Sequence, residues 1–144
     1  MTQYSLAHLS DAVLLRGLKA ILVHERETTA ALLAHIAEVD ARKLYAPAGY
    51  SSMFVYCVEE LRLSEDAAAK RIQAARAARR FPVIFTAVAE GRLHLSGVCL
   101  LAPHLTPDNL DELVLAATHR RKPEIEELLA RHFPMEGSRS ECSI

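Results

Sequence analysis

The sequence predicts an all-α fold: a single helical domain of about six or seven helices, with a long N-terminal helix and a helix-turn-helix-like unit. Three observations predict this class. The 144 residues are rich in Ala and Leu, and only 6% are aromatic. The five glycines and six prolines fall mostly between apolar segments. Within those segments apolar residues recur at steps of three or four, without the alternation that strands require.

The first predicted helix begins after Ser10, a suitable N-cap, and continues to about Lys43. A polar stretch at 25–29 leaves open a break into two helices, but one long helix is favoured. About 30 helical residues span about 45 Å. That is longer than a domain of this size needs, so part of the stripe can face another chain, and a homodimer through this helix is one such arrangement. Its apolar stripe comprises Leu14, Leu18, Ile21, Leu32, Ile36 and Val39.

Residues 52–80 form the predicted helix-turn-helix-like unit. Pro47 and Gly49 end the long helix, and Ser51 or Ser52 caps a short one. The tight turn "LRLS" follows, with Arg62 where such turns usually have Gly. A capped helix then extends from Ser64 to about Arg80.

The remaining segments predict shorter helices. Pro82 opens one that ends near a left-handed Gly91, and Ser96 caps the next. Thr106 starts another helix, and Pro123 opens the last. The predicted organisation is an N-terminal segment (1–9), a helical domain (10–133) and a flexible C-terminal tail (134–144).

Charge and cysteine usage restrict the function classes. The net charge is −1, so nucleic-acid binding would depend on a local patch. The three widely spaced cysteines fit free thiols in a reducing compartment. The N-terminus lacks the pattern of a signal peptide, and no apolar run is long enough to span a bilayer. These features predict a cytoplasmic protein with no membrane partner.

The helix after Ser64 has a basic ridge that predicts DNA contact. Lys70, Gln73, Arg76 and Arg80 lie within an arc of about 120°. Such a ridge can grip phosphates and read base edges, with Arg76 and Arg80 on phosphates or guanines and Gln73 on adenine. The alternative is that this is an ordinary solvated face. The predicted DNA-contacting residues of this helix are Lys70, Arg71, Gln73, Arg76, Arg79 and Arg80.

A second basic cluster, "HRRK" at 119–122, predicts further phosphate contacts by Arg120, Arg121 and Lys122. Its alternative role is to complement the dipole of the preceding helix.

No residue pattern predicts catalysis, a metal site or a cofactor. His94, Cys99 and His104 do not have the spacing of metal ligands, so we expect a buried thiol and two boundary histidines. The sequence contains neither a phosphate-binding loop nor a nucleophile with an evident base. We therefore expect a non-enzymatic protein without a cofactor.

Several strings in the chain resemble a known family. "GYSSMFVYCVEELRLSE" (49–65), "GRLHLS" (91–96), "LAPHLT" (101–106) and "EIEELLA" (124–130) resemble the N-terminal helical region of bacterial HNH endonuclease-type proteins. The resemblance covers residues 9 to about 133, and the HNH nuclease unit is absent from this chain. It implies a role in binding or positioning DNA and assigns no catalytic residue. The helix-turn-helix followed by "AEGRLHLS" is also similar, more weakly, to the DNA-binding region of ParB-type partition proteins.

Together these features predict a non-catalytic DNA-binding or DNA-positioning module. The alternative is a helical protein–protein interaction or dimerisation module without DNA binding. A nuclease in its own right is a third hypothesis.

Overall fold

The computed structural model describes residues 4–134 and is all-α, which confirms the predicted fold class. A single domain contains seven α-helices in the described part of the chain. They are α1 (Asp11–Arg42), α2 (Met53–Val55), α3 (Glu65–Arg80), α4 (Val83–Ala89), α5 (Leu95–Leu101), α6 (Leu110–Ala117) and α7 (Lys122–His132). A π-helical turn (Tyr56–Glu60) follows α2, and a 3-10 turn (Ala102–His104) follows α5.

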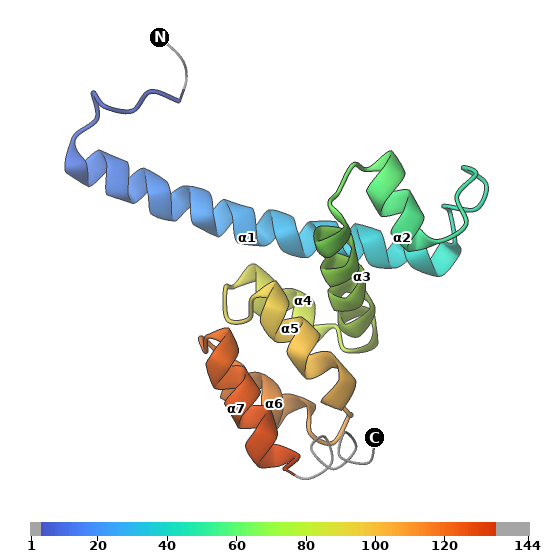
Figure 1. Cartoon of the computed structure of the whole chain (residues 1–144). Helices are drawn as coiled ribbons and strands as arrows, with labels where there is room; N and C mark the ends of the chain where they lie inside the picture. Colours follow the sequence, from blue (N-terminus) through green and yellow to red (C-terminus); the bar gives the residue numbers. More distant parts are fainter. Residues whose placement is uncertain (1–3, 135–144) are drawn as a thin grey trace.

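Helix α1 is one unbroken helix of 32 residues, as the apolar stripe predicts. The hydroxyl of Ser10 accepts a hydrogen bond from the Val13 amide, and Lys43 ends the helix in the left-handed conformation. The polar stretch at 25–29 does not interrupt it. Figure 1 shows its second half crossing α3, while its first half extends past all the other helices.

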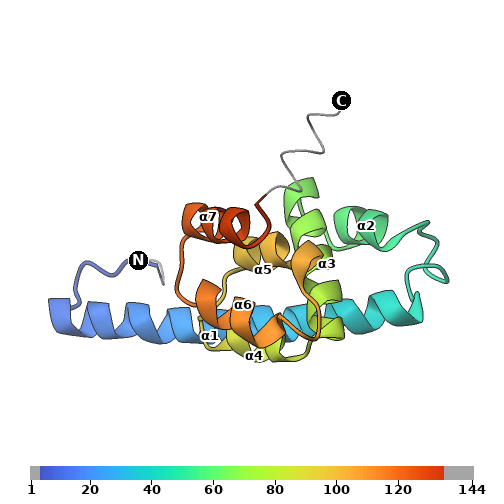
Figure 2. The same cartoon turned by 90° about the horizontal axis from the view of Figure 1, so that it is seen from below.

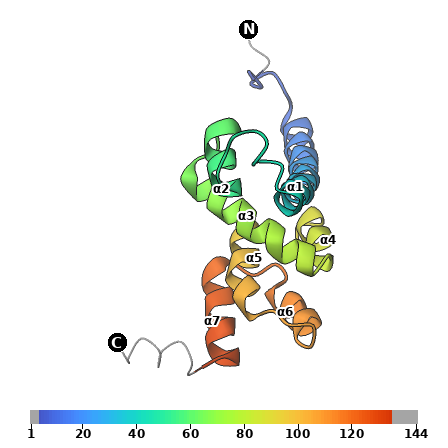
Figure 3. The same ribbon diagram turned by 90° about the vertical axis from the view of Figure 1, so that its right-hand side faces the viewer.

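Helix α3 is the central helix of the domain. It packs against α1 and α5, and Figure 3 shows it lying between α1 and α2 on one side and α5 to α7 on the other. Alanine side chains let neighbouring helices approach closely on both sides. The α3 side chains buried in this way are Ala68, Ile72, Ala74, Ala75, Ala77 and Ala78.

The predicted helix-turn-helix-like segment is present as a helix, a turn and a capped helix. Ser52 and Ser64 accept hydrogen bonds from the Val55 and Ala67 amides and so cap the two helices. The first helix ends in the π-helical turn, which the sequence did not predict. Arg62 has φ of 64°, so it holds the left-handed conformation that Gly usually occupies in such turns.

Two predicted helix starts are wrong. Helix α5 is capped by His94, whose Nδ1 accepts from the Gly97 amide, so Ser96 lies inside the helix. Helix α6 begins only at Leu110, because Thr106 and Asn109 bond each other's amides in a closed turn that delays the helix. At the start of α5, the His94 ring takes the role of the Ser or Asp side chain that usually bonds the amide three residues ahead.

Among residues 4–134, no other helix covers the apolar side chains of the first half of α1. Every residue from Asp11 to Thr28 is exposed except Gly17, which is half-buried. The buried residues of α1, Ala30, Leu33, Ile36 and Ala37, all belong to its second half. Figure 2 shows the same overhang from below. We call residues 11–28 the overhang of α1.

Most of the predicted C-terminal tail, residues 135–144, lies outside the described residues, as do residues 1–3 of the N-terminal segment. Within residues 4–134, no helix is both long and apolar enough to cross a bilayer.

Replacement of Leu33 by Ala tests the α1 part of the core. The Leu33 side chain is 0% exposed, so its loss should reduce the free energy of unfolding by about 2–5 kcal/mol in urea denaturation. Leu115→Ala is the matched control, because Leu115 is 76% exposed, and a change within about 0.5 kcal/mol is expected. Equal effects of the two substitutions would contradict this core.

Candidate nucleic-acid interface

The ridge on α3 is exposed, but several of its polar groups are engaged inside the domain. The Arg76 guanidinium donates two hydrogen bonds to the Asp40 carboxylate of α1, at 2.8 and 3.0 Å. This bidentate contact lowers the pKa of Asp40 and raises the pKa of Arg76. Two of the N–H groups of Arg76 are therefore occupied by the contact between α3 and α1.

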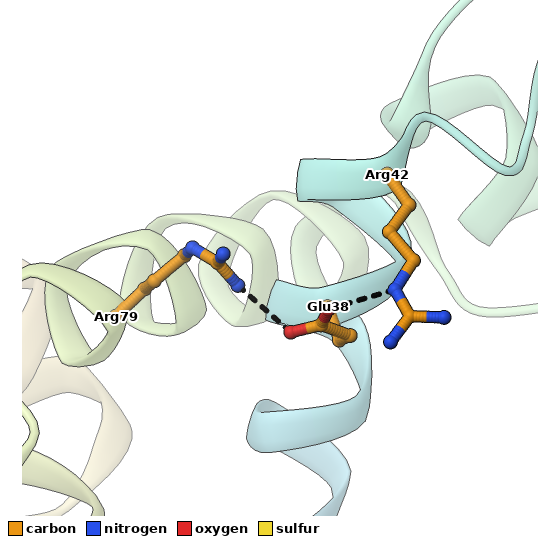
Figure 4. Close-up of polar contacts among 3 residues, drawn as sticks. All are labelled: Glu38, Arg42 and Arg79. Carbon is orange, nitrogen blue, oxygen red and sulfur yellow. Dashed lines mark hydrogen bonds and ion pairs between the residues drawn. The ribbon is translucent and has the colours of Figure 1, made fainter.

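Arg79 is engaged in a similar way one turn further along. Its guanidinium donates to Glu38 of α1 at 3.0 Å, and Arg42 donates to the same carboxylate at 2.7 Å. Figure 4 shows Glu38 between these two cations. The hydrogen bond from Arg42 has the largest effect on the pKa of Glu38, and the hydrogen bond from Arg79 has the next largest. Both lower that pKa.

Lys70 and Gln73 are directed toward α5. The Lys70 ammonium donates to Ser96 Oγ at 3.2 Å, and the Gln73 amide donates to the Cys99 carbonyl at 3.2 Å. The Cys99 thiol donates in return to the Lys70 carbonyl at 3.3 Å. Burial raises the pKa of that thiol, so it remains protonated in this contact.

Apart from Arg79, the basic residues of α3 line two different hollows. The first is a groove of about 560 Å³ beside α2, with Gln73, Arg76 and Arg80 along it and Phe54 and Pro103 among its apolar lining residues. Arg80 also lies over the Phe81 ring, with 4.8 Å between its guanidinium carbon and the ring centroid. Lys70 and Arg71 do not line this groove.

The second hollow is a cleft of about 500 Å³ where α1, α3 and the start of α5 meet. Lys70 and Arg71 line it from α3, Arg26 lines it from α1, and His94 lies at the N-cap of α5. Among residues 4–134, Arg26, Lys70 and Arg71 form no ion pair with a carboxylate. Glu25 is the acidic residue of the lining, so positive charge is in excess. We call this hollow the cationic cleft.

The second basic cluster docks beside the cationic cleft. His94 Nε2 lies 3.0 Å from the Arg120 carbonyl, and because its Nδ1 accepts from Gly97, the Nε2–H is the donor. Arg121 forms an ion pair with Glu124 at 3.7 Å. Arg120 and Lys122 have no carboxylate partner within the described part of the chain. The two clusters are thus joined through His94.

Sequence reasoning missed two residues of the cationic cleft. Arg26 belongs to the long helix, far before Lys70 in the chain, and no local pattern connects them. A methyl group at Gly91 would lie only 2.8 Å from Arg26 Nη1, so this glycine lets Arg26 pack over the turn after α4. His94 was predicted as a boundary histidine, whereas it is the helix cap that holds the second cluster.

The three residues considered as metal ligands have separate structural contacts. His94 caps α5, Cys99 bonds Lys70, and His104 stacks on Phe133 with ring centroids 4.6 Å apart. Within residues 4–134, no group of three or more His, Cys, Asp or Glu side chains is placed to hold a metal ion.

Comparisons of the chain with protein-family models, with characterised proteins and with solved structures give no match.

The Asp40–Arg76 pair makes the α1–α3 contact pH-dependent. Because the folded-state pKa of Asp40 is lowered, its contribution is full above the unfolded value of about 3.9 and is lost as the pH falls below it. A double-mutant cycle with Asp40→Asn and Arg76→Ala should give a coupling of about 0.5–1 kcal/mol near neutral pH. Urea denaturation at neutral and acidic pH measures it, and a coupling that persists undiminished in acid would contradict the pair.

Proposed function

We propose that the protein is a non-catalytic DNA-binding or DNA-positioning module of the cytoplasm, related to the N-terminal region of HNH endonuclease-type proteins. The observation that carries the proposal is the cationic cleft, where Arg26, Lys70 and Arg71 converge without carboxylate partners among the described residues. Phosphate contacts from such cations supply most sequence-independent affinity for DNA.

The neighbouring basic cluster extends the surface that a phosphate backbone would meet. Arg120 lies on the link between α6 and α7, where His94 holds its backbone carbonyl next to the cleft, and Lys122 is the first residue of α7. Backbone contacts of this kind position a protein on a duplex without reading its sequence. The proposal is therefore for DNA positioning through phosphates, with Glu25 as the opposing charge within the cleft.

The groove side of α3 supports the proposal less well. A recognition helix must enter a major groove about 12 Å wide with one face free. Here Arg76 and Arg79 are paired with α1 carboxylates, and α2 and the turn after α5 stand on either side of the free face. We therefore place the DNA on the Lys70–Arg71 side of α3.

The alternative function, a helical protein–protein interaction module, is favoured by a different observation. The overhang of α1 carries large apolar side chains in water, including Ile21 at 70% exposed. Exposed apolar patches of this kind commonly mark interaction sites. This function is compatible with DNA binding at the cationic cleft.

A salt series with two matched double variants tests the DNA proposal. Lys70→Ala/Arg71→Ala removes two charges from the cationic cleft, and Arg76→Ala/Arg80→Ala removes two from the groove. Binding of a short labelled duplex is followed by fluorescence anisotropy. The Lys70→Ala/Arg71→Ala variant should bind the duplex more weakly. The slope of log K against log salt should become less negative by about 2, because two phosphate contacts are lost.

The groove variant is the control, because it changes the net charge by the same amount but should leave the slope nearly unchanged. If the groove variant flattened the slope instead, DNA would lie on the other face of α3. A wild-type protein with no affinity for the duplex even at low salt would overturn the proposal.

A further inference from the structure

The cationic cleft collects hydrogen-bond donors from three separate helices. Because α3 packs against both α1 and α5, side chains from all three helices line one hollow. A ligand in this hollow would meet donors on several sides at once. The donor side chains are Arg26 and Thr29 of α1, Lys70 and Arg71 of α3, and Ser96 of α5.

The position of Arg26 depends on a glycine in the turn after α4. Gly91 has φ of 79°, a conformation that other residues rarely adopt. A Cβ atom there would lie 2.8 Å from Arg26 Nη1 and 2.9 Å from the guanidinium carbon. Any larger residue at this position would therefore displace the guanidinium as well as strain the turn. The glycine keeps Arg26 close to the wall of the cleft.

Lys70 and Ser96 keep free donors although they bond each other. The Lys70 ammonium donates to Ser96 Oγ at 3.2 Å. An ammonium group has three N–H donors, so two remain after this contact. A hydroxyl that accepts one hydrogen bond can still donate its own hydrogen. Both residues can therefore donate to an anion in the cleft.

The charge of the lining matches a doubly charged anion. Three cations, Arg26, Lys70 and Arg71, face one carboxylate, Glu25, which leaves two positive charges. The His94 ring adds no charge, because one of its nitrogens accepts a hydrogen bond and the other donates one. A phosphate monoester carries about 1.5 to 2 negative charges at neutral pH, whereas a phosphate within a DNA strand carries one.

We infer that the cationic cleft binds the terminal phosphate of a DNA strand. This inference rests on the proposed function and specifies which phosphate occupies the site. A terminal phosphate has three free oxygens and one ester link, so donors on several sides can reach it. A phosphate within a strand has two ester links, so the chain must enter and leave the hollow. A strand end enters from one side only.

The rest of the strand would meet further positive charge outside the cleft. His94 lines the cleft and donates to the Arg120 carbonyl, so the link between α6 and α7 lies beside it. Arg120 belongs to this link, and Lys122 begins α7. The phosphates that follow the terminal one would therefore lie near the second basic cluster.

A DNA hairpin with a single open end tests the inference. It is prepared with a 5′-phosphate, with a 3′-phosphate or with hydroxyl groups only, and binding is followed by fluorescence anisotropy at fixed salt. At least one phosphate-ended hairpin should bind about tenfold more tightly than the hydroxyl-ended one, because it gains charge-assisted hydrogen bonds. A hydroxyl-ended hairpin that is longer by one base pair adds two phosphates within the strand, and it should bind like the shorter one.

Single variants of α1 connect this preference to the cleft. Arg26→Gln should reduce the tenfold preference to about threefold or less, because it removes one of the charged donors. Arg16→Gln is the matched control, since it removes the same charge from an exposed position of α1 outside the cleft. It should keep the full preference, and circular dichroism should show equal helicity for both variants. Equal effects of the two variants would exclude the cleft as the site.

The remaining outcomes separate this inference from the proposed function. Equal affinity for hydroxyl-ended and phosphate-ended hairpins would overturn the terminal phosphate and leave DNA binding intact. No affinity for any hairpin would overturn the proposed function and the inference with it. Inorganic phosphate at constant ionic strength should compete with the phosphate-ended hairpin. Tight binding of inorganic phosphate without any preference among the hairpins would assign the cleft to free phosphate and overturn the DNA end.

Discussion

The crossing of α3 over the second half of α1 is the contact on which the rest of the structure depends. Small alanine side chains on both sides of α3 allow α1 and α5 to approach it closely. The ion pairs of Asp40 with Arg76 and Glu38 with Arg79 then fix the position of α3 along α1. Exposed pairs of this kind contribute little stability each, so their main effect is to orient the two helices.

This crossing also explains why a run of basic residues in one helix does not form one basic surface. Because both sides of α3 are packed, its long side chains leave the helix in different directions. Arg76 and Arg79 lie against α1, Lys70 reaches α5, and Arg71 lines the cationic cleft. A charge pattern along a sequence therefore shows how many cations a helix carries, and the neighbouring helices determine which of them meet.

The parts of the fold that depend on local chemistry could be predicted from the sequence. Ser10 and Ser64 cap their helices through amides three residues away, and Gly91 holds the left-handed conformation after α4. His94 as a cap was missed because residue preferences place Ser there instead. The pairing of Arg76 with Asp40 and the position of Arg26 beside Lys70 join residues far apart in the chain, so they follow only from the packed structure.

The continuity of α1 has a mechanical consequence. An unbroken helix is stiff, and α1 is held to the domain where it crosses α3. Arg26 lies on the exposed side of that crossing, at the edge of the cationic cleft. The packed second half of α1 therefore sets the direction in which the free half projects, and the unbroken course of the helix through residues 25–29 is what brings Arg26 to the cleft.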